Sequence, residues 1–189
     1  MFRHLFLIAV VMLTGLTPVI GSAVELGPTL KVGDQTLVLN GSGTREKYFL
    51  DLYVAGLYLT QPNNQSATII NADAPMAIRI VITSKLVSQE KFLSSLQEGF
   101  NSSTQGKVEP LRNEIQKFRE CFADEISRND VYDLIYVPNH GVVVFKGGKP
   151  KGTVPGLAFK QALFGIWLCD QPADANLKQA MLSGGNVRR

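Results

Sequence analysis

Arg45 is the residue whose type and position best suit a ligand site. It follows the glycine-rich segment Gly41–Gly43, which predicts a turn, and it begins a segment of alternating aromatic and aliphatic residues that predicts a strand. A guanidinium group is permanently charged, and its planar donors can hold a carboxylate, phenolate or enolate through two hydrogen bonds. The alternative is an ion pair with Glu46 or Asp51 at a solvent-exposed strand end, which would contribute little to stability. The residues alone leave both interpretations open.

Few residues are available for metal binding or nucleophilic catalysis. The whole chain has two cysteines and two histidines. A zinc site needs three or four nitrogen, sulfur or carboxylate ligands in close order, and the sequence has no such cluster, so we expect no metal and no cofactor. His140 falls in an expected turn, where a histidine is typically solvated rather than catalytic. Cys121 and Cys169 fall on expected helices and are either small core residues or, in an exported protein, disulfide partners.

The first 23 residues have the pattern of a secretory signal peptide. A basic start with Arg3 precedes the apolar run Leu5–Leu13, and the segment ends with the small residues Gly21–Ala23. The run is shorter than the ~20 residues that a membrane-spanning helix needs. We therefore expect cleavage after Ala23, export to the periplasm and no stable membrane insertion afterwards; an uncleaved anchor is the alternative.

The remaining chain, residues 24–189, has the size of one domain with its own core. The formal net charge of the full chain is +3, and acidic and basic residues are interspersed along it. Because no basic stripe is present, we do not expect nucleic acid as a partner.

Hydrophobic periodicity predicts strands in the first part of the domain. Gly33-Asp34 between two short apolar runs indicates a hairpin. Residues 76–83 alternate strictly, which indicates a strand with one strongly apolar face. The expected elements are strands at residues 29–32, 36–40, 44–50, 52–60 and 76–83, and a short helix at residues 65–71.

Helices and then strands follow in the second part. Ser88 is a typical N-cap for a helix whose apolar residues recur at helical spacing, and a second helix follows Gly106. We then expect strands at residues 130–137 and 142–146, a turn at residues 147–150, and helices around residues 159–167 and 174–182. This order predicts an α+β domain in which an antiparallel sheet is covered by helices on one face.

Four motifs occur in order along the chain. They are the Gly-x-Gly-x-Arg segment 41–45 followed by Tyr53–Leu59, Ile80–Lys85 before a helix, Asp130–Tyr136, and Phe159–Leu168 followed by Gln171-Pro172. In this order and spacing they resemble the chalcone isomerase-like family, and within it the exported bacterial branch. The resemblance implies an open-faced β-sandwich, with a long antiparallel sheet, a helical layer on one side and a ligand cleft between them.

The same resemblance suggests roles for particular residues. Plant enzymes of the family cyclise chalcones to flavanones, whereas related plastid members bind fatty acids without catalysis. The arginine that both share falls on Arg45. The threonine of the enzymes corresponds to Tyr53, and their helix tyrosine and asparagine correspond to Lys91 and Glu98. These differences argue against isomerase activity, because a phenolate substrate would lose its hydrogen-bond partners.

We therefore predict a ligand site made of Arg45, Tyr53 and Lys91. Tyr53 is either a core aromatic residue or a hydroxyl donor, and Lys91 is either a solvated lysine or a ligand contact. The expected function is non-catalytic binding of a fatty acid or similar acidic amphiphile. The alternative is an isomerase, an intramolecular lyase acting on a small phenolic or enolate-forming substrate, with Arg45 as electrostatic stabiliser and Tyr53 as proton donor. A protein-interaction role with a vestigial cleft is a third possibility.

Overall fold

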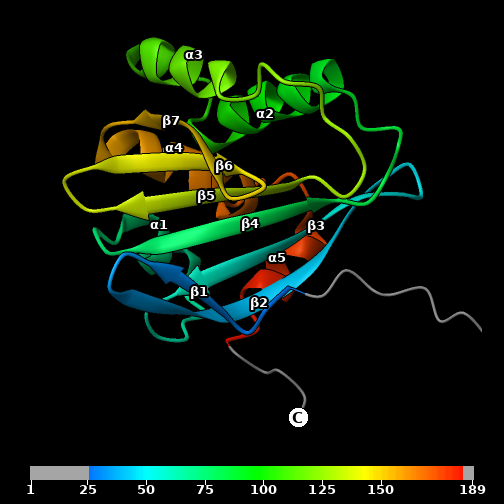
Figure 1. The fold of residues 1–189 in the computed structure, drawn as a ribbon. Helices are drawn as coiled ribbons and strands as arrows, with labels where there is room; N and C mark the ends of the chain where they lie inside the picture. The colour runs from blue at the N-terminus through cyan, green and yellow to red at the C-terminus, as the bar shows by residue number, and fades with distance from the viewer. Residues whose placement is uncertain (1–25, 185–189) are drawn as a thin grey trace, which may run out of the picture.

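The computed structural model describes residues 26–184, so the expected signal peptide lies outside the described residues. Seven strands form one antiparallel sheet in which every strand pairs with its neighbours in the sequence. The strands are β1 (Thr29–Val32), β2 (Gln35–Lys47), β3 (Leu50–Leu59), β4 (Met76–Ile82), β5 (Val131–Val137), β6 (Gly141–Lys146) and β7 (Lys149–Val154). The sheet curls into a half-barrel whose outer face is open in Figure 1.

The helices pack on one side of this sheet. They are α1 (Ser66–Asn71), α2 (Gln89–Ser103), the 3-10 turn Glu109–Leu111, α3 (Arg112–Glu120), α4 (Leu157–Leu168) and α5 (Ala175–Met181). In Figure 1, α4 and α5 lie behind the strands, and α2 and α3 lie at the upper edge. The prediction of an antiparallel sheet covered by helices on one face is confirmed.

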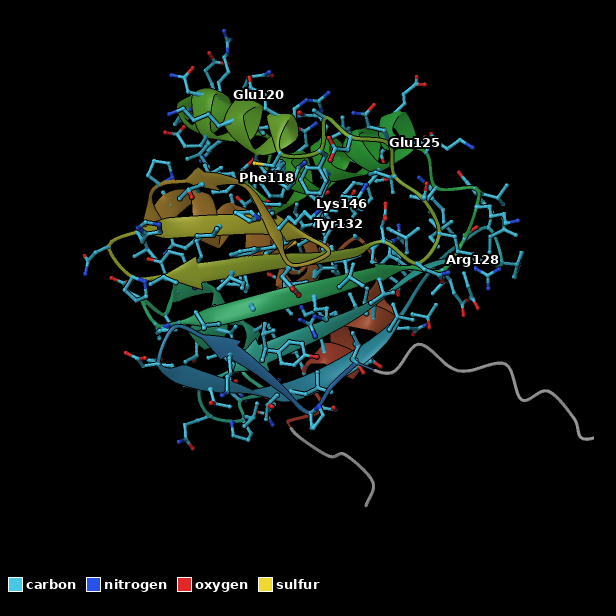
Figure 2. The ribbon with its side chains drawn as sticks, viewed as in Figure 1. Phe118, Glu120, Glu125, Arg128, Tyr132 and Lys146 are labelled. Carbon is cyan, nitrogen blue, oxygen red and sulfur yellow. The ribbon has the colours of Figure 1, made fainter. Side chains whose placement is uncertain are left out.

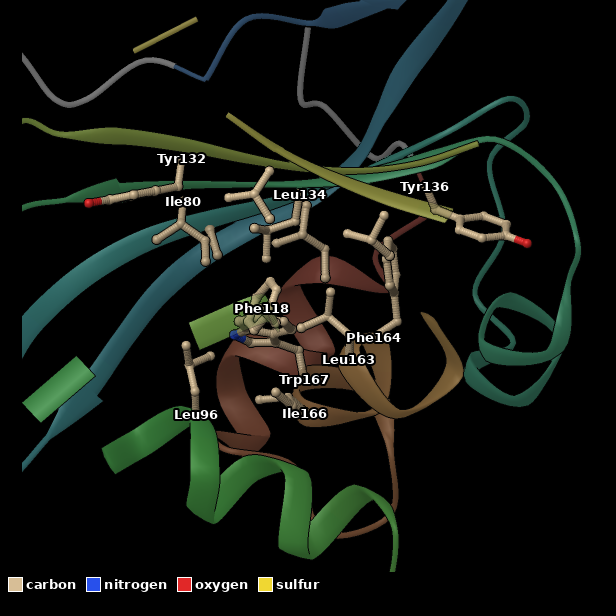
Figure 3. Close-up of a cluster of buried hydrophobic side chains, with 14 of the residues drawn as sticks. Ile80, Leu96, Phe118, Tyr132, Leu134, Tyr136, Leu163, Phe164, Ile166 and Trp167 are labelled. Carbon is tan, nitrogen blue, oxygen red and sulfur yellow. The ribbon is translucent and has the colours of Figure 1, made fainter. Parts of the chain in front are cut away.

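Every second residue of the central strands β4 and β5 belongs to the main core. Ile78, Ile80 and Ile82 of β4 are fully buried on the helix side. Figure 3 shows Ile80 and Leu134 extending from the strands toward side chains of α4, including Trp167. α4 is buried almost all round, since it lies between the sheet and the outer helices. The alternate apolar residues of the strands and the apolar residues of α4 therefore pack into one core.

α4 also carries a buried charge, Lys160. Its Nζ donates hydrogen bonds to the carbonyls of Ile69 and Ile70 at 2.9 Å and of Ala72 at 2.7 Å. These groups end α1, where helical carbonyls have no partner within the helix. Burial lowers the pKa of Lys160 from 10.5 to about 8, against the attraction of Asp73. Lys160 thus attaches the end of α1 to α4.

At the other end of the sheet, Lys146 attaches the connection between α3 and β5 to the strands. Its Nζ lies 2.9 Å from the Asp130 carboxylate and also donates to the carbonyl of Glu125. Figure 2 shows Lys146 beside Tyr132, with Glu125 on the connection above them. The ammonium group lies 5.6 Å from the centre of the Tyr132 ring. Charge contacts therefore attach this connection to the sheet, beside the packing of Phe92 from α2 on the Tyr132 ring.

Two expectations about the β-strands are wrong. The expected turn at Gly41–Gly43 is absent, because β2 runs without a break from Gln35 to Lys47. The glycines instead allow α5 to approach, since a Cβ atom on Gly43 would lie 2.8 Å from the Cβ of Ala180. The chain turns later, at Tyr48-Phe49. The expected turn at residues 147–150 is shorter, and the strand β7 that follows it was not predicted.

Cys121, Cys169 and His140 differ in their exposure. Cys121 is buried, Cys169 is partly buried, and both are free thiols, so no disulfide joins them. His140 is exposed in the turn between β5 and β6. Within residues 26–184, no group of three or more His, Cys, Asp or Glu side chains could hold a metal ion. In the same range no helix has the length and apolar character needed to cross a membrane.

Candidate functional site

A cavity of about 680 Å³ lies between the β2–β3 hairpin, α2 and the end of α4. This volume is within the range of small-molecule sites, roughly 300–1,000 Å³. The strands contribute Arg45 and Tyr53, and the helices contribute Phe92, Leu96 and Trp167. The cavity thus has two polar groups from neighbouring strands and a mixed wall from the helices, in which these apolar side chains stand beside serines and charged residues of α2.

Arg45 lies at the inner side of this cavity and is paired with Asp174. The Nη1 group donates to Asp174 Oδ2 at 3.2 Å and to the carbonyl oxygen of Glu46 at 2.6 Å. The two charged side chains are only 16% and 11% exposed, so this is not a solvent-exposed surface pair. The expected alternative, an ion pair with Glu46 or Asp51, is not formed. Instead the partner is the N-cap of α5.

Asp174 holds three donors with one carboxylate. Oδ1 accepts from the backbone N–H of Leu177 at 3.0 Å, which caps α5, and Oδ2 accepts from the N–H of Glu46 at 3.2 Å as well as from Arg45. Burial disfavours the charged form, but the two N–H groups and the guanidinium outweigh it and lower the pKa of Asp174. Asp174 is therefore ionised at neutral pH and fixes the position of Arg45.

Tyr53 lies opposite Arg45 in the β2–β3 register and is 8% exposed. Its hydroxyl oxygen accepts a hydrogen bond of 3.0 Å from Nε1 of Trp167. Burial raises the pKa of Tyr53, while Trp167 and Arg45 act in the opposite direction. The phenol is therefore protonated at neutral pH. Because an indole only donates, the phenol keeps its own proton to donate to a ligand.

The outer part of the cavity is charged. Lys91 is exposed on the first turn of α2, where its Nζ lies 3.4 Å from the carbonyl oxygen of Leu86. Lys47 at the end of β2 faces Glu98 of α2 across the opening, with Nζ 3.7 Å from Oε2. Both partners line the cavity. An exposed pair of this kind is weak, so the two sides of the opening are only loosely joined.

The structure brings Arg45, Tyr53 and Lys91 together around one cavity, with Arg45 and Tyr53 inside and Lys91 at the rim. That they bind a ligand stays a prediction. Sequence reasoning missed Asp174 and Trp167. An N-cap at Asp174 could have been read from the helix that follows it, but its contact with β2 joins residues 129 positions apart. No local pattern reports such a contact.

Comparisons with known proteins agree with the fold. The model of a family described as chalcone isomerase-like matches residues 21–183, and the chain therefore belongs to this family. A search of curated proteins found no significant match. Among solved structures, the chain is similar to a fatty-acid binding protein of Arabidopsis thaliana, with a TM-score of 0.63 and 23% sequence identity over 80% of this chain and 89% of that chain. The predicted family is confirmed, and membership of its exported bacterial branch stays a prediction.

Proposed function

We propose that this protein binds a fatty acid or a similar acidic amphiphile in the cavity and does not transform it. The observation that carries the proposal is the pairing of two hydrogen-bond donors, Arg45 and Tyr53, in a cavity that also presents the apolar side chains of Phe92, Leu96, Ile166 and Trp167. Charge-assisted hydrogen bonds from such donors favour an anionic head group. The apolar side chains of α2 and α4 would enclose the tail.

The state of each donor supports an acceptor-only head group. The phenol of Tyr53 is protonated at neutral pH, because burial raises its pKa. Both hydrogen bonds that Arg45 makes in the structure start from Nη1, so a ligand can meet the rest of the guanidinium fork. A carboxylate placed between the two residues accepts from both. A neutral hydroxyl would gain less from this arrangement.

The similar protein of Arabidopsis thaliana gives independent support. It is a fatty-acid binding protein, and its fold spans most of this chain. The support is for the class of ligand and not for a particular chain length.

The helix side of the cavity favours binding over isomerisation. The positions that resemble those of the enzymes' tyrosine and asparagine carry Lys91 and Glu98 at the outer rim. Glu98 faces Lys47, and its carboxylate has no donor to offer a phenolate where the enzymes have an asparagine. Tyr53 could still protonate an enolate, and the chalcone cyclisation assay tests this: turnover that depends on Arg45 and exceeds the spontaneous rate would contradict a purely binding function.

The binding test uses a fluorescent fatty acid titrated into wild type, Arg45→Lys and Arg45→Ala. A charge-assisted contact contributes roughly 1.5–3 kcal/mol, so Arg45→Ala should weaken binding about ten- to a hundredfold. Arg45→Lys should recover only part, since an ammonium group lacks the planar fork. The matched control is Arg112→Ala, which removes an exposed arginine paired with Glu109 far from the cavity. Equal affinity of all four proteins, or no binding by wild type, would refute the proposal.

We also propose that the chain is exported to the periplasm with residues 1–23 removed. The support is the signal-peptide pattern that ends at Gly21–Ala23. Intact-mass analysis of the protein from its own host tests it. A mature N-terminus at Val24 is the expected result, and a mass that retains the first 23 residues would contradict it.

A further inference from the structure

The exposed apolar side chains of this protein gather at one place. Within residues 26–184, the large hydrophobic residues that are exposed are Tyr48 (83%), Phe49 (100%), Leu50 (46%) and Leu86 (52%). They belong to two loops, the β2–β3 hairpin and the β4–α2 connection, which extend from the same end of the sheet in Figure 1. We call these four residues the apolar rim. Apolar side chains gathered in this way mark an interaction site.

The apolar rim is continuous with the cavity. Tyr48, Leu50 and Leu86 also line its opening, whereas Phe49 lies at the hairpin tip and does not. An occupant of the rim would therefore lie directly over the entrance through which a ligand reaches Arg45.

The hairpin tip has a conformation that its residues do not favour. Lys47 pairs with Leu50, so Tyr48 and Phe49 form a two-residue turn with φ of 53° and 64°. Asn-Gly or Gly-Gly suits such a turn, and the left-handed region is unfavourable for an aromatic residue. Two aromatic side chains at this tip are thus not explained by the turn itself. A contact made by the side chains would explain them.

A lysine lies next to the apolar residues of each loop. Lys47 precedes Tyr48, Lys85 precedes Leu86, and Lys91 lies beside the second loop. Lysine next to an exposed aromatic or aliphatic side chain can reach lipid phosphates while its neighbour enters the acyl region. Acidic residues are also near: Glu46 and Asp51 are exposed on the hairpin one residue further from its tip, and Glu90 and Glu98 lie on α2, where Glu98 is paired with Lys47. The tips of the two loops themselves therefore present apolar groups with a lysine as the nearest charge in the sequence.

We propose that the apolar rim docks onto a phospholipid bilayer, with Tyr48, Phe49 and Leu86 inserted at the boundary between the head groups and the acyl chains. Docking in this orientation places the cavity opening against the membrane. An acidic amphiphile then passes between bilayer and cavity without crossing water. The identity of this cargo rests on the proposed function, whereas the docking itself does not.

The experiment measures co-sedimentation with vesicles of phosphatidylcholine, alone and mixed with phosphatidylglycerol. Wild type should bind both kinds of vesicle to a similar extent, because the apolar side chains supply the attraction and the nearby charges of opposite sign offset each other. Phe49→Ser should lose about tenfold in partitioning, as expected for removing one buried aromatic side chain. The control is His140→Ser in the exposed β5–β6 turn at the opposite end of the sheet, which should bind as wild type does.

Two further measurements separate docking from ligand binding. Phe49 does not line the cavity, so Phe49→Ser should bind a fluorescent fatty acid normally in solution. Arg45→Ala should lose the fatty acid but keep vesicle binding. If wild type does not bind vesicles, or if Phe49→Ser partitions onto them equally well, the docking proposal is wrong. This conclusion holds whether or not Arg45→Ala loses fatty-acid binding. A concentration-dependent dimer that Phe49→Ser abolishes would show instead that the rim meets a second copy of the chain.

Discussion

Lys160 should make the stability of this protein depend on pH in a way that can be isolated. In the folded chain its pKa falls from 10.5 to about 8, because burial penalises the charge. At about 1.4 kcal/mol for each pH unit, the difference corresponds to roughly 3 kcal/mol. Since the unfolded chain keeps the proton up to about pH 10.5, it binds more protons than the folded chain between pH 8 and 10.5. The contribution of Lys160 to stability therefore rises with pH in this window.

The comparison uses urea unfolding of wild type and Lys160→Met. The substitution leaves the carbonyls of Ile69, Ile70 and Ala72 without their donor but also removes a buried charge, so the two effects oppose each other at neutral pH. The pH dependence is the clearer measurement. From about pH 7 to about pH 10, the unfolding free energy of wild type should rise relative to Lys160→Met by about 2–3 kcal/mol.

The control for this comparison is Lys107→Met, because Lys107 is exposed. The difference between wild type and Lys107→Met should stay constant over the same range. Burial also raises the pKa of tyrosines such as Tyr53, so their contribution to the stability of the protein falls above about pH 10. This contribution is the same in every variant and cancels in the differences between variants. A constant gap between wild type and Lys160→Met would show that Lys160 is solvated in the folded protein.

Two other substitutions test the site and its support. Asp174→Asn keeps an N-cap for α5 but removes the charge that competes with a ligand for Arg45, so titration should show fatty-acid affinity rising roughly threefold to tenfold; weaker binding would mean that Asp174 is needed to position Arg45. Gly43→Ala should destabilise the fold by about 1–3 kcal/mol in urea unfolding, because its Cβ would overlap Ala180. Gly27→Ala, whose Cβ would meet its nearest atom at 3.7 Å, should be close to neutral, and equal stability of the two variants would contradict this packing.

Elements whose signal is local could be predicted from the sequence. The alternation of residues 76–82 gave β4, with its even-numbered residues in the main core. Ser88 was expected to cap α2, and its hydroxyl accepts from the N–H of Lys91 at 3.3 Å. In both cases the signal in the sequence lies within a few consecutive residues, although the contacts of β4 itself are with distant strands. Pattern and propensity report such local signals directly.

Elements that depend on contacts between distant parts of the chain could not be predicted from the sequence. Gly41 and Gly43 are typical of a turn, yet here they leave room for α5 to pack closely against β2. No neighbouring residue in the sequence indicates that this helix lies there. β7 contains a proline and a glycine, so it shows no alternation, and its strand character comes from pairing with β6. The same limit applied to Arg45, whose partner lies more than a hundred residues away. Its position in a cavity was expected only through family resemblance.

The pairing of Arg45 with Asp174 also explains how a largely buried guanidinium is tolerated when the cavity holds no ligand, and what a ligand must compete with. An unpaired guanidinium with 16% exposure would be costly, so the carboxylate that caps α5 serves as its partner in the absence of ligand. An incoming carboxylate must share Arg45 with Asp174, because the N–H groups of Leu177 and Glu46 hold Asp174 in place. If the cavity binds an acidic amphiphile as proposed, we expect a modest affinity for the head group alone, with the apolar side chains of the cavity supplying most of the binding free energy. We then also expect ligands with long apolar tails to bind better than small acids, which share the head group but cannot fill the cavity.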